Sequence, residues 1–292
     1  MLNGVINVYK EKGYTSHDVV AKMRGIFRQK KIGHTGTLDP DAVGVLPVCL
    51  GNATKLCDLL TDRSKEYRAV LRLGITTDTQ DMSGTVLSEQ EVTCSPEETE
   101  AAVLSFVGEY DQIPPMYSAL KVNGKKLVDL ARRGIEVERK PRRVGILSIE
   151  IGEIDLPRVT MTVRCTKGTY IRTLCEDIGR KLGCGGCMEA LSRTASGQFR
   201  IEDAALLSQL QESCDAGEPE RFLIPTDQVL SEHPAVTSDP EGDRFLHNGN
   251  PVAVEFIHPE TEETCRVYDS TGKFAGLYRK AGRFYRPEKM FL

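Results

Sequence analysis

No apolar run in this chain of 292 residues approaches the roughly 20 residues that a helix needs to cross a bilayer. The first residues, MLNGVINVYKEKG, contain no long apolar core of the kind that a signal peptide has. Hydrophobic residues make up 40% of the chain and charged residues 27%, which is ordinary for a globular protein. We therefore expect a cytoplasmic protein without a membrane-spanning segment.

The cysteines give little support to a disulfide framework or a zinc site. There are nine of them, an odd number, and they are scattered along the chain. In a cytosolic chain of this length that distribution favours reduced thiols. Cys184 and Cys187 form the only C-x-x-C pair, and neither a second pair nor a histidine cluster follows it. We interpret this pair as part of a structural turn and predict no metal site.

Positive charge is scarce overall, because the formal net charge is −4 and the pI is about 5.9. That balance argues weakly against a nucleic-acid partner, but the distribution of charge matters more than its total. Residues 121–143 carry nine lysines and arginines against three acidic residues, a local charge of +6 that leaves −10 for the rest. This basic segment is a candidate phosphate-binding surface, and the alternative is a solvated charged loop. Its candidate contacts are Lys121, Lys125, Lys126, Arg132, Arg133, Arg142 and Arg143.

The basic segment also contains few large apolar residues. We expect it to bury little surface on its own and to be mobile until phosphates neutralise its charge.

The stretch from Lys31 to Gly51, KIGHTGTLDPDAVGVLPVCLG, joins a polar, turn-rich half to a half that is almost wholly apolar. Pro40 disfavours the α-helical region for Asp39, and the glycines of the first half permit close backbone approaches. A loop held on a buried strand, here Val43 to Leu50, is a common way to fix a reactive side chain. Asp39 is therefore a candidate reactive residue, and a plain surface turn is the alternative.

Elsewhere the pattern alternates between strands and amphipathic helices, which predicts an α+β domain with a largely antiparallel sheet. Ser16 is the expected cap of a helix that extends to about Arg28. The polar stretch Thr76 to Gly84 is expected to be a solvated turn, with Asp78 and Asp81 in it. Strands are expected at 4–9, 65–74, 143–155, 158–166, 251–256, 264–268, 274–280 and 283–286, helices at 96–107, 171–182 and 202–210, and a linker at 225–239.

The stretch GHTGTLDPDAVGVLPVCLGNATK, Gly33 to Lys55, closely resembles the signature of the TruB family of tRNA pseudouridine synthases. Further stretches resemble other motifs of the family and occur in the family's order: KEYRAVLRLG (65–74), QIPPMYSALKV (112–122), KGTYIR (167–172) and MEALSRTASGQF (188–199). One departure is Glu11, which stands where the family usually has a proline, so the rigidity of that turn needs another source.

The resemblance implies roles for individual residues. It implies that Asp39, Tyr67 and Arg172 are catalytic, and that His34, Tyr170, Leu191 and Lys10 bind the substrate. On pattern alone the alternatives are a packed strand tyrosine at 67, a surface arginine at 172, a core leucine at 191 and a turn histidine at 34. It also implies a pseudouridine synthase core at 1–232 and a small β-rich, PUA-like RNA-binding domain at 233–292.

The implied reaction converts one uridine in the T-arm of tRNA, position 55, to pseudouridine. Uracil leaves C1′ of the ribose, rotates and rejoins through C5, so no redox change and no cosubstrate are involved, and we expect no cofactor. The absence of a G-x-G-x-x-G or P-loop motif fits this expectation. A carboxylate such as Asp39 can act as a covalent nucleophile, at C1′ or at C6, once the base has left its stack.

We expect tRNA to be the partner of a monomer that needs no other protein. Two other functions stay open at this point. One is an RNA-binding or RNA-folding protein with incidental activity, and the other is an N-glycoside hydrolase, which requires a second carboxylate. Free uracil as a product would identify the hydrolase, whereas a product of unchanged mass would identify the isomerase.

Overall fold

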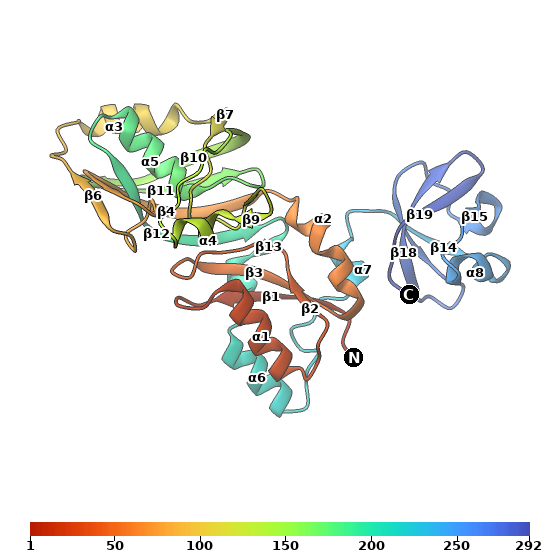
Figure 1. Cartoon of the computed structure of the whole chain (residues 1–292). Helices are drawn as coiled ribbons and strands as arrows, with labels where there is room; N and C mark the ends of the chain where they lie inside the picture. Colours follow the sequence, from red (N-terminus) through yellow and green to blue (C-terminus); the bar gives the residue numbers. More distant parts are fainter.

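A nine-stranded sheet forms the larger part of the molecule in the computed structural model, which describes residues 1–292 (Figure 1). The strand order is β1-β3-β12-β4-β11-β10-β7, with β2 paired to β3 and β13 paired to β12. All pairs are antiparallel except β3–β12. The strands are β1 Gly4–Lys10, β2 Ile32–His34, β3 Val43–Leu50, β4 Lys65–Leu73, β7 Gly108–Gln112, β10 Arg142–Asp155, β11 Arg158–Cys165, β12 Gly186–Ser196 and β13 Phe199–Arg200. The predicted α+β fold with a largely antiparallel sheet is confirmed.

The burial of β3 explains its apolar sequence. Leu46, Val48 and Leu50 pack into one hydrophobic cluster, which they share with the helices α1 (Ser16–Ile26) and α6 (Leu207–Asp215). Val45 and Cys49 belong to a second cluster on the other side, together with residues of η1 (Gly51–Leu56) and α2 (Cys57–Thr61). Because both faces of β3 are covered, the strand has no solvent side and reads as a continuous apolar run.

The helices lie on both sides of the sheet, except α8, which belongs to the small C-terminal domain (Figure 1). They are α1 Ser16–Ile26, α2 Cys57–Thr61, α3 Pro96–Leu104, α4 Leu127–Ala131, α5 Ile171–Lys181, α6 Leu207–Asp215, α7 Thr226–Val229 and α8 Pro240–His247, with 3-10 turns η1 Gly51–Leu56, η2 Ile201–Asp203 and η3 Val254–Phe256. Two short hairpins, β5 Ile75–Thr77 with β6 Val86–Glu89 and β8 Lys121–Val122 with β9 Lys125–Lys126, complete the larger part of the molecule.

The cap of α1 differs from the prediction by one residue. Thr15 caps the helix and forms a reciprocal capping box with Asp18. Ser16 is free for another contact, and its hydroxyl accepts a hydrogen bond from Leu38 N at 2.9 Å. The helix start is therefore tied directly to the loop that carries Asp39.

The predicted helix at 202–210 is wrong in its first half. Residues 204–206 are extended and lie beside β1, where Ala205 N donates to Asn7 O and Tyr9 N donates to Ala205 O. Pairing with β1 satisfies this backbone better than an isolated helical turn can. The helix α6 starts only at Leu207.

Residues after Val229 form a small β-rich domain on the side of α2 and α7 (Figure 1). Its sheet has the order β15-β19-β18-β17-β14-β16. The strands are β14 Ala235–Ser238, β15 Val252–Ala253, β16 Ile257–His258, β17 Cys265–Tyr268, β18 Phe274–Ala281 and β19 Phe284–Met290. The predicted linker at 225–239 is partly wrong, because it contains α7 and β14. Val236 of β14, which stands between Pro234 and Pro240 in the sequence, is buried in the core of this domain. The sequence analysis also missed α8.

The C-terminal domain is anchored to the first part of the chain. Leu277 and Phe291 belong to the same hydrophobic cluster as Val5 and Val45. The Tyr268 hydroxyl donates to Asp227 Oδ2 at 2.9 Å. These contacts give the domain a defined position relative to the main sheet.

The cysteines and helices give three further observations. All nine thiols are free, and no group of three or more His, Cys, Asp or Glu side chains is arranged to hold a metal ion. Cys184 lies in the turn between α5 and β12, whose glycines at 183 and 185 have φ of 78° and 75°. None of the helices combines the length and the apolar character that crossing a membrane requires.

Candidate active site

The loop between β2 and β3 places Asp39, and it is tied down on both sides of that residue. Leu38, just before it, is buried and bonded to Ser16. Pro40, just after it, accepts hydrogen bonds at its carbonyl from Lys10 Nζ at 3.0 Å and from Gly13 N at 2.9 Å. These bonds hold the turn that lacks the family's usual proline, because they attach it to the Asp39 loop.

Lys10 lies beneath the same loop. Its side chain is fully buried, and its ammonium donates to the carbonyls of Glu11 and Pro40. Burial lowers the pKa of Lys10 to about 8, against the opposing attraction of Asp39 and Asp41. In this structure the Lys10 ammonium supports the loop of Asp39, and its contact with substrate stays a prediction.

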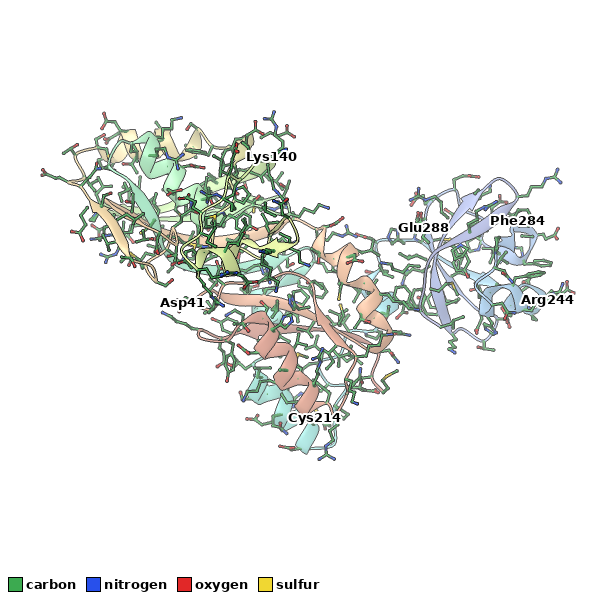
Figure 2. The ribbon with its side chains drawn as sticks, viewed as in Figure 1. Asp41, Lys140, Cys214, Arg244, Phe284 and Glu288 are labelled. Carbon is green, nitrogen blue, oxygen red and sulfur yellow. The ribbon has the colours of Figure 1, made fainter.

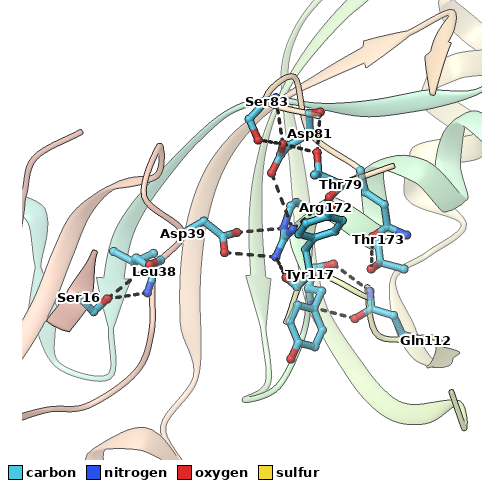
Figure 3. Close-up of polar contacts among 12 residues, drawn as sticks. Ser16, Leu38, Asp39, Thr79, Asp81, Ser83, Gln112, Tyr117, Arg172 and Thr173 are labelled. Carbon is cyan, nitrogen blue, oxygen red and sulfur yellow. Dashed lines mark hydrogen bonds and ion pairs between the residues drawn. The ribbon is translucent and has the colours of Figure 1, made fainter. Parts of the chain in front are cut away.

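Asp39 and Arg172 form a bidentate ion pair (Figure 3). Arg172 Nε lies 3.0 Å from Asp39 Oδ2, and Nη2 lies 3.2 Å from Oδ1. The guanidinium also donates to Thr79 O at 3.0 Å and to Tyr117 O at 2.8 Å. Three segments of the chain therefore converge on one arginine in the first turn of α5 and fix the orientation of the carboxylate.

The exposures of the two partners differ. The Arg172 side chain is 6% exposed, whereas the Asp39 side chain is 35% exposed. The arginine is thus part of the interior, and the carboxylate is the member of the pair that an incoming molecule can reach. Burial raises the pKa of the Asp39 carboxyl, Arg172 opposes the rise, and Asp81 adds to it.

Asp81 is a site residue that the sequence analysis missed. Its Oδ2 lies 3.8 Å from Arg172 Nη1, and its side chain is only 16% exposed. Its Oδ1 accepts from Thr79 Oγ1 at 2.7 Å and Ser83 N at 3.0 Å. The turn interpretation holds for the local bonds and for Asp78, which accepts from the backbone of residue 85. The same interpretation is wrong in expecting the Asp81 side chain to be exposed to solvent.

The reason for the error lies in a distant strand. Met188 N donates to Gln80 O, and Met82 N donates to Met188 O, so β12 draws the 76–84 loop against the start of α5. No local pattern around Asp81 encodes this pairing. The sequence of β12 likewise names no partner for this loop.

Tyr67 and Leu191 lie on neighbouring strands. Tyr67 is almost entirely buried in β4, and Leu191 of β12 is paired with Ala69 and packs against the main core. Burial raises the pKa of the Tyr67 phenol, while the neighbouring Arg193 opposes the rise. Both side chains therefore belong to the core, as the alternative interpretation expects. Their roles at the site stay predictions.

His34 and Tyr170 lie on two different elements, at the end of β2 and just before α5. His34 Nδ1 accepts from Gly36 N at 3.3 Å, and its ring meets His17 edge to face at 5.8 Å. Burial and His17 lower the pKa of His34, which favours the neutral ring. Tyr170 is the N-cap residue of α5, and its backbone exchanges two hydrogen bonds with the side chain of Gln112.

Most of the basic segment at 121–143 is exposed, as expected of a segment that buries little surface on its own. The exceptions are Leu127 and Leu130 of α4, which are buried with Met116 in a small cluster. Tyr117, packed against this cluster, is the residue whose carbonyl bonds Arg172. The segment is thereby connected to Arg172 through Tyr117.

The predicted phosphate contacts fall into two groups. Lys121, Lys125, Lys126, Arg132, Arg133 and Arg142 form no ion pair, whereas Arg143 pairs with Glu109 and Asp111, both at 3.3 Å. Lys140 of the same segment lies at the edge of the molecule (Figure 2). The six cations without an ion pair are therefore available to bind an anion along the basic segment.

Two family models match the chain. Residues 24–171 match the TruB family pseudouridylate synthase N-terminal domain, and residues 172–231 match the tRNA pseudouridylate synthase B C-terminal domain.

Relatives of high similarity span the whole chain. The chain is 50% identical to tRNA pseudouridine synthase B of Lachnoclostridium phytofermentans over 100% of both chains. It is 49% identical to the protein of the same name from Alkaliphilus oremlandii, over 90% of this chain and 89% of that one.

Solved structures share the fold. A chain of a Cbf5–Nop10–Gar1 complex superposes with a TM-score of 0.75 at 28% identity, covering 99% of this chain and 85% of that chain. A chain of an H/ACA RNP bound to a substrate RNA containing 2′-deoxyuridine gives a TM-score of 0.73 at 26% identity, with 99% and 85% covered. With the matches of sequence, these establish that the chain belongs to the TruB family of pseudouridylate synthases and is an isomerase.

Proposed function

We propose that the protein converts one uridine in the T-arm of tRNA, position 55, to pseudouridine, with Asp39 as the nucleophile. The observation that carries this proposal is the bidentate Asp39–Arg172 pair, in which the partly exposed carboxylate is held by a buried arginine. The relatives named tRNA pseudouridine synthase B support tRNA as the substrate.

The residues of this site can supply the groups that the reaction needs. The N1–C1′ bond breaks, the C5–C1′ bond forms, and the hydrogen at C5 is replaced while N1 gains one, so the product has the mass of the substrate. Asp39 supplies an ionised oxygen to C1′ or C6, and Arg172 keeps that oxygen aimed and charged. Tyr67 offers its ring to the uracil and its hydroxyl to proton transfer at C5.

The remaining predicted residues are assigned to holding the RNA. A uridine in a folded arm must leave its stack to reach Asp39. We assign Tyr170 and Leu191 to the pocket wall and His34 to the space that the base vacates. The unpaired cations of the basic segment are assigned to phosphates of the arm.

The division of the chain belongs to the same proposal. Residues 1–232 form the catalytic domain, and residues 233–292 form the PUA-like domain that extends the RNA contact. The protein acts as a monomer without another protein. Its C-terminal domain carries eight lysines and arginines against nine acidic residues, so contacts there depend more on shape than on net charge.

The hydrolase alternative has a second carboxylate nearby in Asp81. The oxygens of Asp81 are already engaged by Arg172, Thr79 and Ser83, and the side chain is mostly buried, which disfavours a role in activating water. The isomerase is therefore the better supported function.

Unmodified tRNA transcript incubated with the protein tests the proposal. Nucleoside mass spectrometry is expected to detect pseudouridine in the T-arm, at unchanged RNA mass and without free uracil. A transcript whose T-arm uridine is replaced by cytidine is the matched control and is expected to gain no pseudouridine. Release of uracil, or modification elsewhere only, would overturn the proposal.

A further inference from the structure

Arg193 is a buried cation that the proposed chemistry does not yet use. It lies in β12, its side chain is among the largest that are fully buried, and only 1% of the residue is exposed. No carboxylate lies within ion-pair distance of it, in contrast to Arg172. Burying an unpaired charge is costly, and such groups are retained where they do something that a neutral side chain cannot.

The hydrogen bonds of Arg193 go to both ends of the Asp39 loop. Its Nε donates to Val45 O at 2.6 Å, and its Nη2 donates to Gly36 O at 3.4 Å. Gly36 precedes Asp39 and Val45 follows it, so one guanidinium is hydrogen-bonded to the chain on both sides of Asp39. A planar fork with several donors suits this task, because it fixes two carbonyls at once.

The position of Arg193 in the sheet brings it to Tyr67 as well. Arg193 pairs with Tyr67 across β12 and β4, and it pairs with Gly44 across the parallel junction of β12 and β3. A side chain at position 44 is excluded, because a Cβ there would lie 2.3 Å from Arg193 O. The strand that carries Tyr67 and the loop that carries Asp39 therefore meet at this residue.

We propose that Arg193 is a positioning residue that holds the Tyr67 hydroxyl and the Asp39 loop in one fixed arrangement. This inference rests on the proposed function, which gives Tyr67 and Asp39 their parts in the reaction. Arg193 does not touch the substrate, since it is closed to solvent. It acts through the two groups on either side of it.

The test compares Arg193→Gln and Arg193→Lys in two backgrounds, wild type and Tyr67→Phe. In the wild-type background we expect Arg193→Gln to lower the single-turnover rate by about 100-fold, the loss typical of a misplaced catalytic group. Arg193→Lys keeps the charge and part of the bonding, so it is expected to recover part of that rate. Affinity for unmodified tRNA, measured by filter binding, is expected to stay unchanged in both.

The Tyr67→Phe background separates positioning from general support of the fold. There the hydroxyl is already absent, so Arg193→Gln is expected to cost much less than it costs in the wild type. Lys65→Gln is the matched control, because Lys65 is also a buried cation of β4 but donates to the carbonyls of Thr61 and Arg63. It is expected to show equal losses in both backgrounds.

Three results would overturn the inference. The first is an equal loss from Arg193→Gln in both backgrounds, and the second is a loss explained by weaker tRNA binding. The third is a failure of both Arg193 variants to fold, as judged by circular dichroism, which would make the guanidinium a requirement of folding alone. If Tyr67→Phe by itself turns over normally, the role given to Tyr67 in the proposed function fails first, and this inference falls with it.

Discussion

Arg172 and Arg143 are both paired with carboxylates, but their side chains are 6% and 61% exposed. Arg172 meets Asp39 through two short contacts inside the protein, whereas Arg143 meets Glu109 and Asp111 at 3.3 Å on the surface. The desolvation of a buried pair costs stability that its attraction repays only in part, whereas an exposed pair contributes about 0–1 kcal/mol. The same type of ion pair therefore has a different use in the two regions.

The comparison extends to the regions as wholes. Around Asp39 the charges are few, paired and fixed in direction, which is what a reacting group requires. Along the basic segment most charges are exposed and unpaired, which suits a long-range attraction to phosphates that salt can screen. Chemistry and affinity are thus expected to respond to different substitutions.

The largest expected effect is that of Asp39→Asn. The variant keeps the size of the side chain but loses its charge and its nucleophilic oxygen, so we expect turnover to vanish while tRNA binding persists. A single-turnover assay that scores pseudouridine, run beside a binding titration, checks this. Retention of even about a tenth of the wild-type rate would mean that Asp39 is not the nucleophile.

Arg172→Lys is expected to reduce the single-turnover rate by about 100-fold, because a point charge cannot replace the planar fork that orients Asp39. Arg180→Lys is the matched control, since Arg180 lies on the same helix with 66% of its side chain exposed and pairs only with Glu176 and Asp177. The control is expected to turn over normally. Near-normal rates for both variants would remove Arg172 from the site.

The basic segment is expected to affect binding and to leave the chemical step alone. Replacing Arg132, Arg133 and Arg142 with Gln should weaken tRNA binding and flatten the plot of log K against log salt, by about 0.9 for each duplex phosphate that is no longer neutralised. Adding Arg143→Gln should change the slope less than each of these, because Arg143 is already paired with acids.

Fluorescence titrations of tRNA at several salt concentrations measure these slopes. The saturating single-turnover rate of the same variants is the internal control and is expected to stay at the wild-type value. An unchanged slope and affinity would mean that the segment does not touch RNA.

The smallest expected effect is that of Asp39→Asn on thermal stability. Its dependence on pH tests how burial acts on the charge at the site. Burial raises the pKa of Asp39, so the folded chain holds that proton more tightly than the unfolded chain does. The ionised carboxylate therefore costs stability above the folded-state pKa, and the cost disappears as the pH falls below the unfolded value of about 3.9. Relative to wild type, Asp39→Asn should melt higher at neutral pH, and the difference should shrink as the pH falls.

Thermal melts of the two proteins at a series of pH values measure this difference. Asp41→Asn, next to the same loop but largely exposed, is the control and should show no such trend. A lower melting temperature for Asp39→Asn at neutral pH would contradict the prediction and would show that the ion pair outweighs burial.

Much of the fold could be predicted because its signals are local. Alternation and the turn at Asp155–Pro157 predict the β10–β11 hairpin, which pairs Asp155 with Arg158. The errors occur where a distant strand decides the conformation. Residues 204–206 are extended because β1 pairs with them, and 235–238 form a strand because β17 lies alongside.

The candidate site shows the same division. Asp39 stands out because a proline, glycines and an apolar run surround it in the sequence. Asp81 does not, because its neighbours are those of any polar turn, and its contact with Arg172 depends on β12. The resemblance assigns Lys10 to the substrate, and only its burial reveals that its ammonium faces Pro40.

The sequence by itself determined where the loop of Asp39 begins and ends, which strands are buried, and how strongly 121–143 is charged, because these depend on neighbours along the chain. Only the tertiary structure decided which groups meet. Asp39 and Arg172 are 133 positions apart, and Arg193 reaches Val45 across 148. Such contacts form only after the central strands have assembled, since the parallel pairing of β3 and β12 and the antiparallel pairing of β12 and β4 set the separation of these side chains.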